Sequence, residues 1–229
     1  MSQITLYYVE GACSLAPHAL LRHIGVPFKA VAMKFRPGDN GLEAADGSLS
    51  NADFRKINPA GYVPALIVDG ETITEQPAVM TMVTLLSPDK EAGAALLGRD
   101  PLDQVRATQW MAWLSDTLHS IGYGAFLHPQ RYVEDNKDMY AVVKAKGLKT
   151  IESSYGLIEK RMEERTYAVG QHLTVVDIFL YVLWRWSSFI SDFDMKGKYP
   201  AYGKLVRRVE ALDGVRKAIE IERLKLVFE

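Results

Sequence analysis

A single cysteine, Cys13, lies in a segment whose residue types favour thiol chemistry. The residues before it are typical of a short strand, Gly11 marks a turn, and the residues after it begin a helix. Free backbone N–H groups and the helix dipole stabilise a thiolate, so we expect the pKa of the Cys13 thiol to be lowered. The alternative is a small buried apolar residue, which is the usual state of a free cysteine.

Val63 and Pro64 stand between a loop and a predicted strand, in a place suited to peptide binding. A proline cannot donate to a β-ladder, so it fits the first residue of a strand. An X-Pro bond also tolerates the cis form, which would direct the backbone N–H and C=O of Val63 away from the sheet. An extended peptide could then pair with them as an added strand. An ordinary loop proline is the alternative.

Glu75 and Gln76 precede a helix that Pro77 is predicted to begin. The free N–H groups of a helix N-terminus can hold a carboxylate, and Gln76 adds a side-chain donor. Glu75 can meet an amine beside that carboxylate. The pair therefore suits the amino-acid end of a peptide, with simple helix capping as the alternative.

The elements that must position these residues form a strand–helix–strand unit followed by a hairpin and a helix. Strands are predicted at 3–9, 28–33, 63–68 and 72–74, and helices at 14–24, 51–57 and 77–86. Asp69-Gly70 is a type I′ turn signal between the last two strands, and residues 36–50 are expected to be irregular. After residue 87 only helices are predicted, at 101–125, 135–165, 174–192, 200–212 and 214–225.

Composition narrows the function classes. The chain has 229 residues, of which 48% are hydrophobic, and a net charge of −1, so neither nucleic acid nor a membrane is an expected partner. One cysteine excludes an internal disulfide and a cysteine-rich zinc site, and no histidine spacing suggests a metal. The sequence shows neither a secretory signal nor an apolar run that approaches a membrane span, so a cytoplasmic protein is expected.

The order of these motifs resembles that of the glutathione transferases. The segment 11–18, Gly-Ala-Cys-Ser-Leu-Ala-Pro-His, resembles the beta class in particular. The segments 58–66 and 74–75 resemble the family's glutathione-binding domain. In the second half, 110–119 resembles a beta-class helix that ends in a Leu-His pair near the cofactor, and 170–177 resembles a family motif that ends in (Ser/Thr)-x-x-Asp.

The resemblance implies an α+β domain of thioredoxin-like βαβ-ββα topology over residues 1–87, a linker at 88–100 and an all-α domain over 101–229. It also implies glutathione as co-substrate, extended along Val63 with its thiol beside Cys13. The implied catalytic residues are Cys13, Ser14 and His119, and the implied glutathione-binding residues are Tyr8, Val63, Pro64, Glu75 and Gln76.

His119 also stands out by spacing. Ala112, Ser115, Asp116 and His119 form one polar stripe of an α-helix, while Ile121 belongs to the apolar side. A neutral imidazole facing the cleft could donate to, or accept from, the sulfur of glutathione. A partly exposed surface histidine is the alternative.

The family's motif 174–177 has a physical meaning of its own. Thr174 and Asp177 are spaced as a capping box, and the apolar residues that follow predict a buried central helix. This motif is expected to be structural rather than catalytic. The family's basic residue after the second strand has no clear counterpart, and Lys34, Arg36 and Arg55 are the candidates.

The expected function is that of a cytoplasmic, homodimeric glutathione transferase that acts in detoxification on small hydrophobic electrophiles. It would use the glutathione thiolate for conjugation, or a mixed disulfide at Cys13 for thiol transfer or peroxide reduction. Two rivals stay open. One is a specialised glutathione-dependent isomerase, lyase or dehalogenase, and the other is a non-catalytic ligand-binding or subunit protein.

Overall fold

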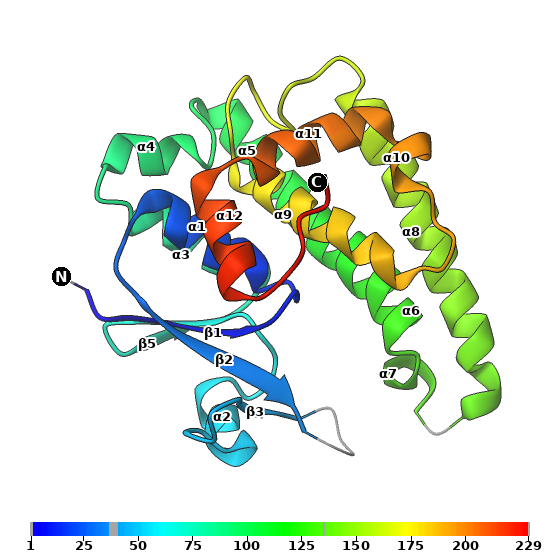
Figure 1. The fold of residues 1–229 in the computed structure, drawn as a ribbon, viewed down its shortest axis with the longest axis horizontal. Coiled ribbons are helices and arrows are strands. Elements are labelled where there is room, and N and C mark those ends of the chain that lie inside the picture. The colour runs from blue at the N-terminus through cyan, green and yellow to red at the C-terminus, as the bar shows by residue number, and fades with distance from the viewer. Residues whose placement is uncertain (1, 37–40, 135, 229) are drawn as a thin grey trace.

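The computed structural model describes residues 2–36, 41–134 and 136–228, which form a mixed sheet followed by a layer of helices (Figure 1). The first part contains β1 (Ile4–Val9), α1 (Leu15–Ile24), β2 (Lys29–Phe35), β3 (Leu42–Ala44), α2 (Asn51–Ile57), β4 (Ala65–Val68), β5 (Glu71–Ile73) and α3 (Gln76–Leu85). The mixed α/β fold with a helical second part, as implied by the resemblance, is confirmed.

The sheet has the order β3-β2-β1-β4-β5. β1 lies at its centre, where it pairs in parallel with β2 and antiparallel with β4. The registers Leu6 to Ala30 and Leu6 to Leu66 fix these pairings. Because β1 ends at the middle of the sheet edge, the turn that follows it occupies the centre of that edge.

Two tight turns follow from local sequence. Gly25 adopts a left-handed φ of 72° and ends α1, as glycine readily does at a helix C-terminus. Asp69 and Gly70 have φ values of 51° and 90° between β4 and β5. A type I′ turn needs positive φ at both central residues, so the hairpin prediction is confirmed.

The irregular segment predicted at 36–50 contains a strand, which corrects that expectation. β3 pairs antiparallel with the end of β2, through Phe35 and Leu42. It is an edge strand of three residues, in which buried Leu42 and Ala44 alternate with Glu43. So short an alternation between glycine- and aspartate-rich flanks carries little strand signal. Residues 37–40 of this predicted segment lie outside the described residues.

The second part is helical, and no strand follows β5 in the described residues. Its longer elements are α5 (Pro101–Trp113), η1 (Leu114–Gly124), α8 (Tyr140–Met162), α9 (Val175–Arg185), α11 (Pro200–Glu210) and α12 (Asp213–Ile221). Its shorter ones are α6 (Ala125–Leu127), α7 (Gln130–Val133), η2 (Lys137–Met139), η3 (Trp186–Phe189) and α10 (Met195–Lys198). The last helix, α12, folds back against α1 (Figure 1).

The predicted linker at 88–100 contains the helix α4 (Lys90–Ala95), which the sequence reasoning did not anticipate. Asp89 caps it, because its carboxylate accepts a hydrogen bond from the N–H of Ala92. A helix of six residues leaves too short a pattern for periodicity to detect.

The central helix α9 is buried along almost its whole length, as its apolar sequence predicts. The carboxylate of Asp177 accepts hydrogen bonds from the N–H and hydroxyl of Thr174 and from the N–H of Ala168. Burial raises the pKa of Asp177 to about 6, although these donors act to lower it. The structural role predicted for this motif is confirmed.

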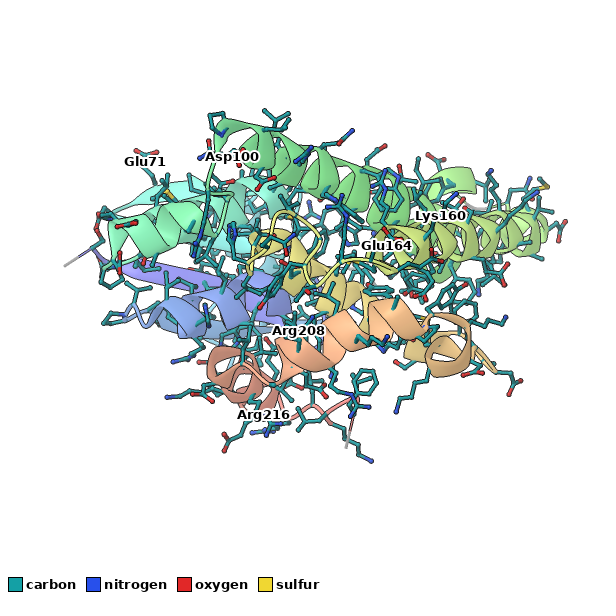
Figure 2. The ribbon with its side chains drawn as sticks, turned by 90° about the horizontal axis from the view of Figure 1, so that it is seen from above. Glu71, Asp100, Lys160, Glu164, Arg208 and Arg216 are labelled. Carbon is teal, nitrogen blue, oxygen red and sulfur yellow. The ribbon has the colours of Figure 1, made fainter. Side chains whose placement is uncertain are left out.

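Charged side chains lie around the periphery of the molecule (Figure 2). Lys160 and Glu164 project from the end of α8 and the turn after it, and Arg208 and Arg216 from α11 and α12. Within the described ranges, no helix is both long and apolar enough to cross a membrane.

Candidate active site

A cavity of about 810 Å³ opens between the edge of the sheet and the helices of the second part. The predicted residues that line it are Cys13, Val63, Pro64, Glu75, Gln76 and His119. Tyr8 and Ser14 are not among its lining residues. Four segments distant in sequence therefore meet around one space, of the size that small-molecule sites usually have.

The Cys13 thiol is almost fully buried at the wall of the cavity. Its Sγ lies 3.2 Å from the carbonyl oxygen of Val63, to which it donates a hydrogen bond. Burial raises the pKa of the thiol to about 12, while the backbone N–H groups of Ser14 and Cys13 lower it by less. The expectation of a lowered pKa is therefore wrong. The backbone donors are present, but burial destabilises the thiolate by more than these hydrogen bonds stabilise it.

Ser14 and Tyr8 support the site from behind. The Ser14 hydroxyl accepts a hydrogen bond from the N–H of Val9 and lies 3.3 Å from the Val9 carbonyl, so it is engaged within the turn. Of the polar groups of Ser14, it is the backbone N–H, and not the hydroxyl, that acts on the Cys13 sulfur. The Tyr8 ring packs on His18, with centroids 4.9 Å apart, inside the core.

The Val63-Pro64 bond is cis. The carbonyl of Val63 receives the Cys13 thiol, and its N–H has no hydrogen-bond partner among the described residues. A backbone donor is thus available at the cavity wall, at the strand entry where the sequence predicts that an extended peptide could pair.

Glu75 and Gln76 lie where β5 passes into α3 and line the cavity. Glu75 has a φ of 66°, a left-handed conformation that non-glycine residues adopt mainly where the surrounding structure requires it. Gln76 is only 5% exposed, yet both its amide oxygen and its amide nitrogen lack a partner among the described residues. Buried amides are almost always paired, so both amide atoms of Gln76 have hydrogen-bonding capacity that the described residues do not use.

His119 lines the cavity from η1 and packs on Trp186, with ring centroids 5.0 Å apart. Burial lowers its pKa to about 4, and the charge of Arg131 adds to that effect. The imidazole is therefore neutral near neutral pH. Neutral imidazole can donate from one ring nitrogen and accept at the other, as the sequence reasoning required.

The segment around His119 is a π-helix, whereas the sequence reasoning assumed one α-helix over 101–125. Hydrogen bonds in a π-helix run to the fifth residue back, so its faces are wider than the α-helical spacing assumes. Ser115 and His119 face the cavity as expected, but Asp116 is exposed and does not line it. Ile121, assigned to the apolar side, is 41% exposed. The α-helical spacing was therefore wrong for Asp116 and Ile121.

Several lining residues were not predicted as site residues. Trp186 and Phe189 both line the cavity. Ser115 faces it with a hydroxyl that has no partner among the described residues. Tyr62 and Arg131 meet across its mouth, where the guanidinium lies 4.8 Å from the ring centroid. Only the position of Tyr62 beside Val63 could have signalled one of them.

The turn that carries Cys13 is held from the C-terminal part of the chain. The N–H of Gly11 donates to the carboxylate of Glu222, and the carbonyl of Gly11 accepts from the indole of Trp186. The other oxygen of Glu222 lies 2.7 Å from Nδ1 of His18, and both side chains are fully buried. Segments more than 170 residues apart in sequence thus fix one turn.

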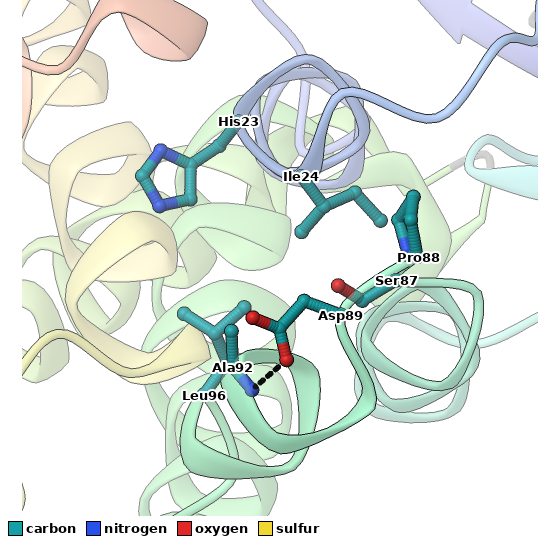
Figure 3. A pocket seen from close by; sticks show the side chains of 7 residues that line it. All are labelled: His23, Ile24, Ser87, Pro88, Asp89, Ala92 and Leu96. Atoms are coloured by element: carbon teal, nitrogen blue, oxygen red, sulfur yellow. Dashed lines mark hydrogen bonds between the residues drawn. The ribbon is translucent and has the colours of Figure 1, made fainter.

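A second, smaller cavity of about 280 Å³ lies between the end of α1 and the start of α4 (Figure 3). His23 and Ile24 face it from one side and Asp89 from the other, with the Asp89 carboxylate bonded to the N–H of Ala92. None of the predicted site residues reaches it. In the part of the chain that the structure describes, no group of histidine, cysteine and acidic residues could hold a metal ion.

The chain is similar in sequence and in fold to known proteins. The family model "Glutathione S-transferase, C-terminal domain" matches residues 115–213. Glutathione S-transferase GstA of Escherichia coli O157:H7 is 28% identical over 225 residues, covering 96% of this chain and 99% of that protein. A sphingomonad glutathione S-transferase solved in complex with glutathione is 29% identical, with a TM-score of 0.76 over 96% of this chain and 100% of that one.

The chain is thus similar to glutathione S-transferases over nearly its whole length, as the resemblance drawn from the sequence implies. Its bacterial neighbours include the beta-class enzyme of Sphingomonas chungbukensis, which is 29% identical with a TM-score of 0.74 over 96% of this chain and 100% of that one. A glutathione S-transferase from Xylella fastidiosa shares the fold at a TM-score of 0.80 and 24% identity, over 97% of this chain and 100% of that one. The beta-class resemblance drawn from the sequence is confirmed.

Proposed function

We propose that this protein binds glutathione in the 810 Å³ cavity and transfers it, as a thiolate, to a small electrophile. The observation that carries the proposal is the unpaired, buried amide of Gln76 at the N-terminus of α3, in the same cavity as Cys13 and the free N–H of Val63. A tripeptide with a terminal amino-acid group supplies partners for each of these. The complex of the sphingomonad relative with glutathione supports this ligand.

The proposed orientation follows from the polar groups. The γ-glutamyl carboxylate lies at the N-terminus of α3 and accepts from Gln76, and its ammonium group meets the carboxylate of Glu75. The cysteinyl residue pairs with the N–H of Val63 as an added strand. This pose directs the glutathione sulfur toward Cys13 and His119, across the cavity from each other.

The nucleophile in the proposed reaction is the thiolate of glutathione rather than that of Cys13. Because burial holds the pKa of Cys13 at about 12, this side chain is a hydrogen-bond donor in the resting protein, not a nucleophile. The Cys13 thiol and the neutral imidazole of His119 can both donate to a sulfur anion beside them. Conjugation then needs only that this anion attack the electrophile and displace its leaving group.

Calorimetric titration of the full chain with glutathione tests the proposal. Binding together with formation of a dinitrophenyl conjugate from 1-chloro-2,4-dinitrobenzene is the expected result. Stabilisation by apolar ligands but not by glutathione would instead support the non-catalytic ligand-binding protein. Binding of glutathione without formation of the dinitrophenyl conjugate would favour the specialised isomerase, lyase or dehalogenase.

Cys13→Ala separates the two roles of the thiol. If Cys13 only donates a hydrogen bond to the sulfur anion, conjugation slows by about 10- to 100-fold but persists. If Cys13 is itself the nucleophile in thiol transfer, that activity disappears, and the wild type carries a glutathione adduct on Cys13 that mass spectrometry detects. Full retention of thiol transfer in Cys13→Ala would exclude the mixed-disulfide role.

We also propose that the protein acts in the cytoplasm, that its role is detoxification, and that it forms a homodimer. Leu85, Leu102 and Val105, on α3 and α5, are each more than half exposed, and such apolar side chains support a partner surface there. Sedimentation equilibrium tests the dimer, and Leu102→Glu with Val105→Glu is expected to yield a monomer. The proposed functional units are residues 1–87 and 101–229.

A further inference from the structure

The cation that binds the second carboxylate of glutathione is absent from the places where the sequence suggested it. Glutathione carries one carboxylate on its γ-glutamyl end and another on its glycyl end. Lys34 pairs with Glu43, with 3.5 Å between the charged groups, and Arg55 donates to the carbonyl of Pro59. Neither these two nor Arg36 lines the cavity.

The order of the strands defines where the glycyl end lies. Glu75 and Gln76 line the cavity at the β5 side of the sheet, which receives the γ-glutamyl end in the proposed pose. The cysteinyl residue pairs at the start of β4, so the glycyl residue continues away from β5. The lining residues on that far side come from the ends of β2 and β3 and from the loop after α2: Phe35, Leu42, Asn58, Ala60 and Tyr62. None of these carries a positive charge.

Arg131 supplies that charge from the opposite wall. It projects from α7 and lies over the ring of Tyr62, and among the described residues it is the one Lys or Arg that lines the cavity. No ion pair or hydrogen bond occupies its guanidinium in the described part of the chain. Its charge already contributes to lowering the pKa values of His119 and His128, so its field reaches into the cavity.

The remaining charges of the cavity favour the same assignment. Glu75 is committed to the ammonium group in the proposed pose, and Glu10 is a second carboxylate, directly after β1. The cavity therefore repels a carboxylate near these two residues and attracts one near Arg131. The Arg131 guanidinium lies over the Tyr62 ring, 4.8 Å from its centroid, and its N–H groups, which have no partner in the described residues, can make a bidentate carboxylate contact.

We propose that Arg131, on a helix of the second part, is the residue that binds the glycyl carboxylate of glutathione, with Tyr62 as the platform that positions its guanidinium. The proposal rests on the proposed function. It makes glutathione a bridge between the sheet and α7, and it makes the free glycyl carboxylate a requirement for tight binding.

The test compares glutathione with its glycyl monoethyl ester, which lacks that carboxylate charge. Calorimetry is carried out on the wild type, Arg131→Gln and the control Arg55→Gln, whose side chain is a nearby cation outside the cavity. Arg131→Gln is expected to weaken glutathione binding by about 10- to 100-fold and to leave binding of the ester unchanged. Arg55→Gln is expected to change neither. Because Arg131 is exposed, the variant retains its fold, which its melting temperature verifies.

Two results would overturn this assignment while the proposed function stands. Equal weakening of both peptides would mean that Arg131 acts by supporting the cavity wall. Unchanged binding of both, with a raised KM for an acidic electrophile, would assign Arg131 to the second substrate. A wild type that binds neither peptide would overturn the proposed function, and this assignment with it.

Discussion

Two groups of buried polar side chains lie on either side of Cys13, and they differ in how far they are paired. Around the turn, Glu222 receives the N–H of Gly11 and contacts His18, so an element from the end of the chain satisfies the backbone of the site. On the cavity wall, the side chains of Gln76 and Ser115 have no partner in the described structure, whereas in the first group Nε2 of His18 lacks one but Nδ1 is bonded. We infer that the first group maintains the site and the second is prepared to bind a ligand.

The largest effect is expected from Glu222→Ala. This change leaves the buried His18 ring and the N–H of Gly11 without their partner, and each buried polar group that loses its hydrogen bond costs about 1–3 kcal/mol. Urea denaturation measures the free energy of unfolding, with Glu220→Ala, an exposed carboxylate on the same helix, as the control. Equal free energies of unfolding for the two variants would show that Glu222 does not stabilise the turn.

Gln76→Leu is expected to have the opposite signature. Stability stays the same or rises, because an unpaired buried amide is replaced by an apolar side chain of similar size. Glutathione affinity falls by about 10- to 100-fold, because the carboxylate loses a donor. Calorimetry and thermal melts of the same samples separate the two quantities. Loss of stability with unchanged affinity would make Gln76 a structural residue.

His119, on the cavity wall, is expected to make the stability of the protein depend on pH. Its pKa is lowered in the folded protein, from 6.5 to about 4, chiefly by burial. The unfolded chain therefore takes up a proton below pH 6.5 that the folded protein refuses until about pH 4, so stability falls as the pH decreases through this range. His119→Gln removes this contribution, and its free energy of unfolding is expected to decline less steeply than that of the wild type. Parallel profiles would contradict the lowered pKa.

The smallest effect is expected from Trp186→Phe. The ring still packs on His119, but the indole N–H no longer donates to the carbonyl of Gly11. A single hydrogen bond of this kind contributes about 0.5–1.5 kcal/mol, and the Gly11 carbonyl can turn to solvent of the open cavity. Urea denaturation of the variant is compared with that of Phe189→Leu, which alters the cavity without touching the turn. A loss of unfolding free energy as large as that of Glu222→Ala would mean that Trp186 stabilises the turn as strongly as Glu222 does.

Local signals were enough for much of the fold and for part of the site. The positive φ values at Asp69 and Gly70, the cap of α9 by Asp177 and the cavity position of Gln76 all follow from residues within a few positions of one another. The resemblance implies a catalytic role for Ser14, and in the structure its hydroxyl is engaged with Val9. Sequence adjacency does not tell which way a side chain points in a turn.

The sequence by itself determined four of the five strands, the turn between β4 and β5 and the order of the binding motifs, because these depend on backbone preferences and on short spacings. Only the tertiary structure decided the state of the chemistry. The pKa of Cys13 depends on how completely the surrounding segments exclude water, and the turn that carries it depends on Glu222, more than 200 residues away. The position of Arg131 over Tyr62 likewise depends on how two separate parts of the chain pack. Desolvation and long-range contact are properties of the folded molecule, and no local pattern encodes them.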